Sequence, residues 1–190
     1  MLTIKNQDRN SVRGLADHHV GELAFSGTDN EVLIGGQVTL NQVNIQFLGN
    51  HGRLEIEERC VIRGDIIIHA GATVRIGAST KMNKRCDIRV AANNQVNIGA
   101  DCLLANVKFH AFESVVLINT VTKKRVNPVS PIVVGDRVWI AENCQLGCGA
   151  VIGPGAVIGA NSMVMDSIAA NSLAVGYPAT AIKAGIRWTE

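Results

Sequence analysis

The sequence predicts an all-β protein, a parallel β-helix, and three observations support this: a six-residue period, small residues at fixed offsets and few aromatic rings. Hydrophobic residues make up 47% of the 190-residue chain, whereas aromatic residues make up only 4%. The apolar mass is therefore carried by Val, Ile, Leu and Ala. This composition favours thin, regular layers over a core built around large rings.

The period is clearest in the C-terminal third of the chain. Aliphatic residues recur there at every sixth position, at Val134, Ile140, Leu146, Ile152, Ile158 and Val164. A small residue follows all but the last of them, at Gly135, Ala141, Gly147, Gly153 and Gly159. A period of six does not fit the helical period of about 3.6. It is typical of a hexapeptide β-helix, in which small residues let the chain turn each corner.

The same pattern continues upstream with insertions, and it sets the expected domain limits. Hexads begin at Ile56, Ile76 and Ile98, whereas residues 1–30 show none. We therefore expect an N-terminal lead or cap over 1–30 and a β-helix over 31–176. The tail, 177–190, is expected to contain a short helix from Pro178 to Gly185, because proline favours helix starts and glycine favours helix ends.

The cysteines fit this frame as small inward residues. The chain has five, and four of them follow an inward aliphatic residue by four positions: Cys60, Cys86, Cys102 and Cys144. Small buried cysteines are typical of a reducing compartment. The absence of a C-x-x-C pair argues against a zinc or redox motif, so no metal is expected.

Charge and hydropathy exclude several classes of function. The formal net charge is +2, and no basic run is interleaved with aromatic residues, so we expect no nucleic-acid partner. No apolar stretch reaches the roughly 18 residues of a membrane span. The first residues carry no signal-peptide pattern, which predicts a cytoplasmic protein.

One segment, 110–131, interrupts the hexads and is too long for a corner. We expect a loop that leaves the rod and returns at Ile132, and long loops on rigid scaffolds often carry function. Its densest basic run, 123–125, is either a solvated loop tip or a contact for a phosphate or an acidic acceptor.

Three motifs carry a family resemblance: VVGDRVWI at 133–140, IGPGAVIGA at 152–160 and AVGYPATAIK at 174–183. They resemble the hexapeptide-repeat acyltransferases, and the nearest group is the O-acetyltransferases of the maltose, galactoside and surface-polysaccharide type. The resemblance is most specific over 132–185 and weaker over 52–109. It implies a left-handed β-helix, an exception to the usual right-handed crossover. It also implies a homotrimer that binds acetyl-coenzyme A between neighbouring rods.

The resemblance assigns expected roles to individual residues. Trp139 and Arg85 are expected at the mouth of the active site. The coenzyme contacts are expected at the backbone of Ala141 and Glu142 (oxyanion and pantetheine), at Ala160 (pantetheine), at Tyr177 and Pro178 (distal end) and at Lys183 or Arg187 (3′-phosphate). General chemistry agrees, because pantetheine amides need small side chains along their track and a phosphate needs a cation.

The chain departs from the family at the general base, because the family's histidine position falls on Val115 or Val116. A valine cannot accept a proton. Three interpretations follow. In the first, His110 is displaced into the site by an altered loop. In the second, Glu113 or another group transfers the proton, or the acceptor is an amine that needs little help. In the third, the site is inactive and the protein is a structural or regulatory homologue.

Two functions therefore stay open. The first is an acetyl-coenzyme A-dependent O-acetyltransferase that acts on the hydroxyl of a sugar or polysaccharide precursor. The alternative is a catalytically degenerate trimeric homologue that binds coenzyme or sugar as a scaffold.

Overall fold

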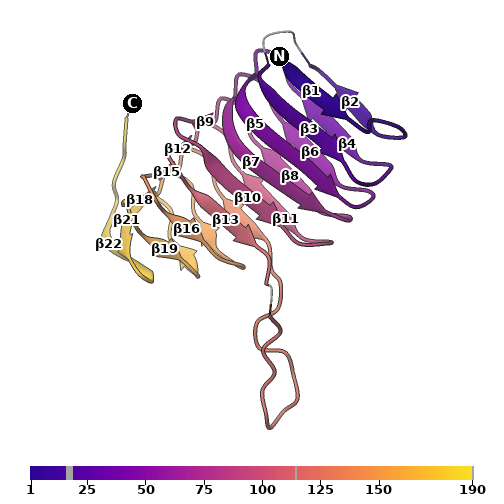
Figure 1. The fold of residues 1–190 in the computed structure, drawn as a ribbon. Coiled ribbons are helices and arrows are strands. Elements are labelled where there is room, and N and C mark those ends of the chain that lie inside the picture. The colour runs from indigo at the N-terminus through magenta and orange to yellow at the C-terminus, as the bar shows by residue number, and fades with distance from the viewer. Residues whose placement is uncertain (16–18, 114, 190) are drawn as a thin grey trace.

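A computed structural model describes residues 1–15, 19–113 and 115–189 of the chain. Its regular elements in these ranges are all β-strands, and every strand pair between consecutive coils is parallel. The strands wind into a rod with three sides, seen as a staircase of coils in Figure 1. The prediction of an all-β, left-handed parallel β-helix is confirmed.

Side 1 is a separate eight-stranded parallel sheet. Its strands are β2 (Ser11–Arg13), β4 (Glu31–Ile34), β6 (Arg53–Ile56), β8 (Thr73–Ile76), β11 (Gln95–Ile98), β14 (Ile132–Val134), β17 (Val151–Ile152) and β20 (Ser167–Ile168). The strands become shorter toward the C-terminus, where the repeat is strictest.

Sides 2 and 3 are joined because two long strands, β5 (Thr39–Leu48) and β7 (Val61–His69), run around the corner between them. Side 2 continues with β9 (Lys81–Met82), β12 (Leu103–Leu104), β15 (Trp139–Ile140), β18 (Val157–Ile158) and β21 (Ser172–Gly176). Side 3 contains β1 (Leu2–Lys5), β3 (Gly21–Phe25), β10 (Cys86–Val90), β13 (Lys108–Ala111), β16 (Gln145–Leu146) and β19 (Met163–Val164). We call the side 1–side 2 edge the first corner, the side 2–side 3 edge the second corner, and the side 3–side 1 edge the third corner.

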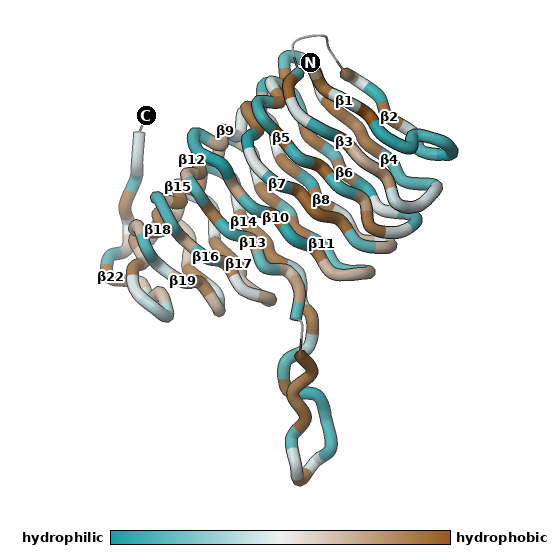
Figure 2. The backbone as a smooth tube through the Cα atoms, viewed as in Figure 1, coloured by the Kyte–Doolittle hydropathy of each residue, from teal (hydrophilic) through white to brown (hydrophobic). Residues whose placement is uncertain are grey.

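The six-residue column is the core of the rod. Its aliphatic side chains are all at most 2% exposed: Val134, Ile140, Leu146, Ile152, Ile158 and Val164. Equivalent positions pair in register from coil to coil, as Ile140 does with Leu104 and Ile158. The tube in Figure 2 therefore alternates between apolar and polar residues along most strands. Burial of this column is the main favourable term that holds the coils together.

The predicted inward cysteines are buried as expected, and burial raises the pKa of their thiols. The pKa of Cys60, Cys86 and Cys102 is raised to about 11 in each case. Cys102 and Cys144 also point their Sγ atoms at the carbonyl oxygens of Gly135 and Gly159 in the next coil. These thiols are therefore protonated core residues.

The corners place many non-glycine residues in the left-handed backbone region. At the second corner this position is held by Asn106, Asn143 and Asn161, with φ of 52°, 64° and 59°. Their amides form a ladder from coil to coil. Asparagine is among the residues that tolerate this conformation best. Gly64 bends β7 at the same corner with φ of 122°, and a Cβ there would lie 1.9 Å from the carbonyl oxygen of Cys86.

The N-terminal residues already belong to the ladder. β1 pairs with β3 and β2 pairs with β4, all in parallel. No break in hydrogen bonding therefore occurs at residue 30, the expected limit of the lead. Hexads are hard to recognise there because the early coils have longer strands. A capping role for 1–30 stays a prediction, and residues 16–18 lie outside the described part.

The predicted C-terminal helix is wrong. Residues 179–184 form β22 (Ala179–Ala184), which folds back and pairs antiparallel with β21. A helix of this length is marginal by itself. The last coil, in contrast, presents unpaired backbone groups that β22 satisfies. Local helix propensity is thus overridden by the open end of a sheet.

The expected loop is present as an arm that projects from the third corner (Figure 1). It leaves after Ala111 at the end of β13 and returns at Ile132 in β14. The arm folds on itself as a hairpin with a bridge between Ile118 and Arg125. Asn127 closes its base by accepting a hydrogen bond from the Leu117 N–H and donating one to the Val115 carbonyl. No helix long and apolar enough to span a membrane occurs among the described residues.

Candidate active site

The predicted coenzyme-binding residues of the rod line up along the second corner. Ala141 and Glu142 follow β15, Ala160 follows β18, and Tyr177 follows β21, one coil after another. The register of these strands brings Ile158 beside Ile140 and Ala174 beside Ile158, so the residues that follow them are also neighbours. Small residues at this corner leave room for an extended ligand along the rod.

We call Ala141, Glu142, Ala160 and Tyr177 the second-corner column. Backbone hydrogen bonds decide which of their amide N–H groups are available to a ligand. The Ala141 N–H donates to the Ile158 carbonyl at 2.9 Å, so it is committed to the ladder. Within the described part of the chain, the N–H groups of Glu142 and Ala160 have no acceptor. The structure therefore leaves Glu142 and Ala160, rather than Ala141, as free amide donors.

Two basic residues stand on the same corner, closer to the N-terminus. Lys84 Nζ lies 2.6 Å from Glu142 Oε1. Arg85 contacts Asp65 Oδ2 and the Gln42 carbonyl, each at 2.9 Å. Arg85 is thus held at the corner and does not approach Trp139, with which the sequence grouped it.

The two candidate phosphate cations lie apart. Lys183 is on β22, exposed and opposite Leu173. Arg187 lies instead by the first corner, where it shares a cavity with Arg137 and Asn171. The width of side 2 therefore separates Arg187 from the second-corner column. Pro178, exposed like Tyr177, lies in the turn between β21 and β22.

Trp139 projects outward from side 2 and is 39% exposed. Its ring lies against that of Trp188 in the C-terminal tail, with centroids 6.4 Å apart and planes at 49°. Trp188 in turn donates its indole N–H to the Arg137 carbonyl at 2.7 Å. The tail therefore folds over the outer surface of side 2.

His110 and Glu113 share a cavity of about 220 Å³ at the base of the arm. His110 is on β13 and Glu113 begins the arm, and the opposite wall includes Cys148 and Met165. The Cys148 thiol donates to the His110 carbonyl at 3.5 Å. Both candidate bases thus lie at one site on side 3.

The environment of His110 favours a neutral imidazole. Burial is the main cause that lowers its pKa from 6.5, and the charges of Lys108 and Arg89 lower it further. Only Asp87 opposes them. A neutral imidazole near pH 7 can accept a proton, which is the state that a general base requires.

His110 and Trp139 do not meet within one chain. His110 points outward from side 3, whereas Trp139 points outward from side 2. Val115 and Val116, at the family's histidine position, lie in the arm and are 63% and 54% exposed. A site that combines His110 with Trp139 therefore needs two copies of the chain.

The fold and the repeat define a hexapeptide-repeat β-helix protein, and comparisons with known proteins agree. Residues 131–165 match the bacterial transferase hexapeptide family (six repeats). The chain is 35% identical over 105 residues to the putative lipopolysaccharide biosynthesis O-acetyl transferase WbbJ of Escherichia coli K12, a match that covers 50% of this chain and 54% of WbbJ. It is 27% identical over 132 residues to the polysialic acid O-acetyltransferase of Neisseria meningitidis, covering 66% of this chain and 59% of that protein.

Among solved structures, the polysialic acid-specific acetyltransferase NeuO superposes on the whole chain. The TM-score is 0.89 at 27% identity, and the match covers 87% of NeuO. The predicted resemblance to the hexapeptide-repeat acyltransferases is confirmed. The chain spans about half the length of the curated relatives it matches, 54% and 59% of the two named above.

Sequence reasoning missed three residues of this region. They are Trp188, which contacts Trp139, Asn127, which contacts Glu113, and Cys148, which contacts His110. A tryptophan near the end of a chain with only two tryptophans was a usable signal for Trp188. Nothing in the hexad pattern marks the other two, because their contacts depend on how the arm folds.

Proposed function

We propose that this protein is an acetyl-coenzyme A-dependent O-acetyltransferase that modifies a sugar hydroxyl of a surface polysaccharide or its precursor. The observation that carries the proposal is the arrangement of side 2. An exposed tryptophan, Trp139, adjoins a corner that offers free amide donors at Glu142 and Ala160. The likeness to polysaccharide O-acetyltransferases over the whole chain supports the same reaction.

The second corner fits a pantetheine arm. The Ala141 and Ala160 side chains are small, and the free Ala160 N–H can donate to an amide carbonyl of such an arm. Acetyl-coenzyme A would supply an activated acetyl thioester there. The Glu142 N–H would stabilise the charge that develops on the thioester oxygen. Lys183, on the last strand, is the better placed cation for the coenzyme's phosphate.

We assign the general base to His110. It takes the proton of the acceptor hydroxyl, whose oxygen bonds to the acetyl carbon as the carbon–sulfur bond breaks. The proton then passes to the departing thiolate, so the products are an acetyl ester and free coenzyme A. Glu113 lies in the same cavity and is the second candidate, but it is more exposed than His110.

A homotrimer is part of the proposal, and the geometry of the site supports contact between copies. His110 and Trp139 face outward from different sides, so side 3 of one copy must meet side 2 of the next to complete a site. The arm also exposes a run of aliphatic side chains from Val115 to Ile118, each at least 50% exposed. Such a run is typical of a surface that another subunit covers. We retain the cytoplasm as the expected compartment of this reaction.

The test is acetyl transfer from acetyl-coenzyme A to a panel of acidic and neutral polysaccharides, followed by release of free thiol. We expect thiol release that depends on a glycan and is reduced by Trp139→Ala. Val151→Ala, an equally exposed aliphatic position on side 1, is the control. Coenzyme binding without turnover on any acceptor would instead support the alternative of a catalytically degenerate scaffold. That alternative is favoured by the valines at 115–116, where the family has its histidine.

A further inference from the structure

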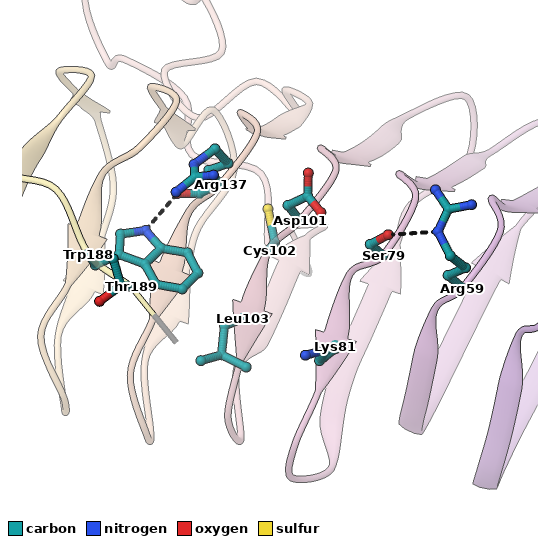
Figure 3. A pocket seen from close by; sticks show the side chains of 9 residues that line it. All are labelled: Arg59, Ser79, Lys81, Asp101, Cys102, Leu103, Arg137, Trp188 and Thr189. Carbon is teal, nitrogen blue, oxygen red and sulfur yellow. Dashed lines mark hydrogen bonds between the residues drawn. The ribbon is translucent and has the colours of Figure 1, made fainter.

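A second hollow lies at the first corner, on the opposite edge of side 2 from the second-corner column. Its volume is about 560 Å³. Figure 3 shows Arg59 at one end, Arg137 and Trp188 at the other, and Lys81 and Leu103 between them. No role proposed above uses this hollow, which we call the first-corner groove.

The coil ladder sets the spacing of the groove's side chains. Arg59, Ser79, Asp101 and Arg137 hold the same corner position in four successive coils, with φ between 53° and 59°. Their N–H groups donate to the previous coil, as Arg137 does to Ala100. At about 4.8 Å per coil, the two arginines are roughly 14 Å apart along the rod. The groove is therefore long enough for an extended ligand.

Two of the four residues at this corner, Arg59 and Arg137, are not of the types that the backbone prefers. Non-glycine residues in the left-handed region are most often Asn or Asp, and the second corner uses Asn three times running. The first corner instead places arginine at two of the four positions. Since the backbone gives no reason for arginine, the positive charge itself is the feature to be explained.

Among the described residues that line the groove, cations outnumber anions. They include Arg59, Lys81 and Arg137, with Asp101 as the carboxylate. Arg59 is ion-paired with Glu58 and donates to Ser79 Oγ at 3.2 Å. Within the described part of the chain, the Arg137 guanidinium forms no ion pair, although Arg137 is exposed. Arg137 is thus the cation best placed to bind an incoming anion.

The wall at the Arg137 end is aromatic and fixed. The Trp188 ring is half-buried, anchored by its hydrogen bond to the Arg137 carbonyl and packed on Trp139. Beyond Trp188 a smaller hollow of about 230 Å³ is lined by Arg137 and Arg187. An indole flanked by guanidinium groups combines an apolar platform for a sugar ring with forked donors for its carboxylate.

We propose that the first-corner groove binds a carboxylate-bearing stretch of the acceptor polysaccharide. This inference rests on the proposed function and adds a substrate class to it. β15 is only two residues long, so Arg137 and Ala141 lie at the two edges of one narrow strip with Trp139 between them. A sugar chain held in the groove presents its next unit at Trp139, facing the coenzyme column across the strip.

The experiment measures binding of three hexasaccharides to the full-length protein without acetyl-coenzyme A, by titration calorimetry. The probes are oligosialic acid, oligogalacturonate and the neutral maltohexaose. We expect at least one acidic hexamer to bind with an affinity that falls as salt rises, and maltohexaose not to bind. Arg137→Gln and Trp188→Ala should each weaken binding about tenfold, as expected for loss of a charge-assisted or aromatic contact.

Arg9→Gln is the matched control. Arg9 is an exposed arginine in the same backbone conformation, with φ of 57°, but it lies at the third corner and pairs with Asp29. Its substitution should leave the affinity unchanged. An equal loss with Arg9→Gln, equal binding of maltohexaose, or no binding of either acidic hexamer would each overturn the proposal.

Two further outcomes identify other occupants. If coenzyme A displaces the bound hexamer, the groove belongs to the coenzyme. If Trp188→Ala changes the mass of the oligomer, the groove is a contact between copies. Either result overturns the proposal. Because the assay contains no acetyl donor, it is independent of turnover. If the hexamer binds but no acetyl transfer occurs, the groove proposal is supported and the proposed reaction is refuted. If acetyl transfer occurs but binding does not depend on the groove residues, the proposed reaction is supported and the groove proposal is refuted.

Discussion

Lys84 and Glu142 are 58 residues apart in the sequence, yet their side chains form an ion pair of 2.6 Å at the second corner. The pair reaches over the intervening coil that carries Asn106. It places a cation beside the carboxylate that adjoins the proposed coenzyme column. Lys84 therefore offsets a negative charge that an anionic coenzyme would otherwise meet.

Lys84→Met should raise the KM for acetyl-coenzyme A by about threefold to tenfold, because Glu142 is then an uncompensated anion. Both partners are about half exposed, so stability should fall by less than about 1 kcal/mol. Steady-state kinetics and urea unfolding of the same preparation check the two effects. The double variant Lys84→Met, Glu142→Gln should recover most of the KM; failure to recover it would contradict the electrostatic explanation.

Replacement of His110 tests the assignment of the general base. His110→Ala should lower kcat by about 10²- to 10⁴-fold, the usual contribution of such a group. Glu113→Gln, in the same cavity, should change kcat by much less. If acetyl transfer is unchanged in His110→Ala and lost in Glu113→Gln, the roles are reversed.

The lowered pKa of His110 also predicts a pH profile. The base works only when its imidazole is neutral, so activity should fall as pH drops through the pKa of His110. Because burial moves that pKa below 6.5, the acid limb should lie below pH 6.5 and the rate should be level near neutrality. A limb centred above 6.5 would assign the titration to another group.

The exposed aliphatic run of the arm predicts how the subunits associate. Val116→Asp should weaken a trimer, because it places a charge in a surface that we expect a neighbouring copy to cover. Light scattering coupled to gel filtration measures the mass over a concentration series. Thr122→Asp near the tip of the arm is the control. A wild-type protein that is monomeric at all concentrations would refute the shared site.

Core truncation tests the importance of the six-residue column. Leu146 is fully buried on side 3 between Phe109 and Val164, so Leu146→Ala should cost about 2–5 kcal/mol of unfolding free energy. Val151→Ala, which is outward on side 1, should cost less than about 1 kcal/mol. Denaturant unfolding gives both values. Equal costs would show that the column is not the core.

The sequence predicted the part of the structure that repeats and failed where the chain stops repeating. Val134, Ile140 and Leu146 could be placed because each repeats one local environment, so a period in the sequence translates directly into a column of side chains. The error at 178–185 arose because local helix propensity says nothing about the unpaired edge of β21. Long-range pairing, not local preference, fixed that segment as β22.

The site was only partly predictable for the same reason. The column of Ala141, Glu142 and Ala160 follows the repeat, and its alignment at one corner is a consequence of the register. The separation of His110 from Trp139 depends on which side of the rod each residue occupies, and that of Arg187 from Lys183 depends on the path of the tail after β22. Trp188 depends on a tail that folds back over side 2, for which the hexads contain no signal.

The arm begins and ends at Ala111 and Ile132, whose side chains are both buried, in consecutive strands on sides 3 and 1 of the rod. The chain is therefore held in the core immediately before the arm and immediately after it. Insertions, deletions and substitutions in the arm can therefore accumulate during evolution without disturbing the β-helix. New acceptor preferences can in this way evolve without a new fold.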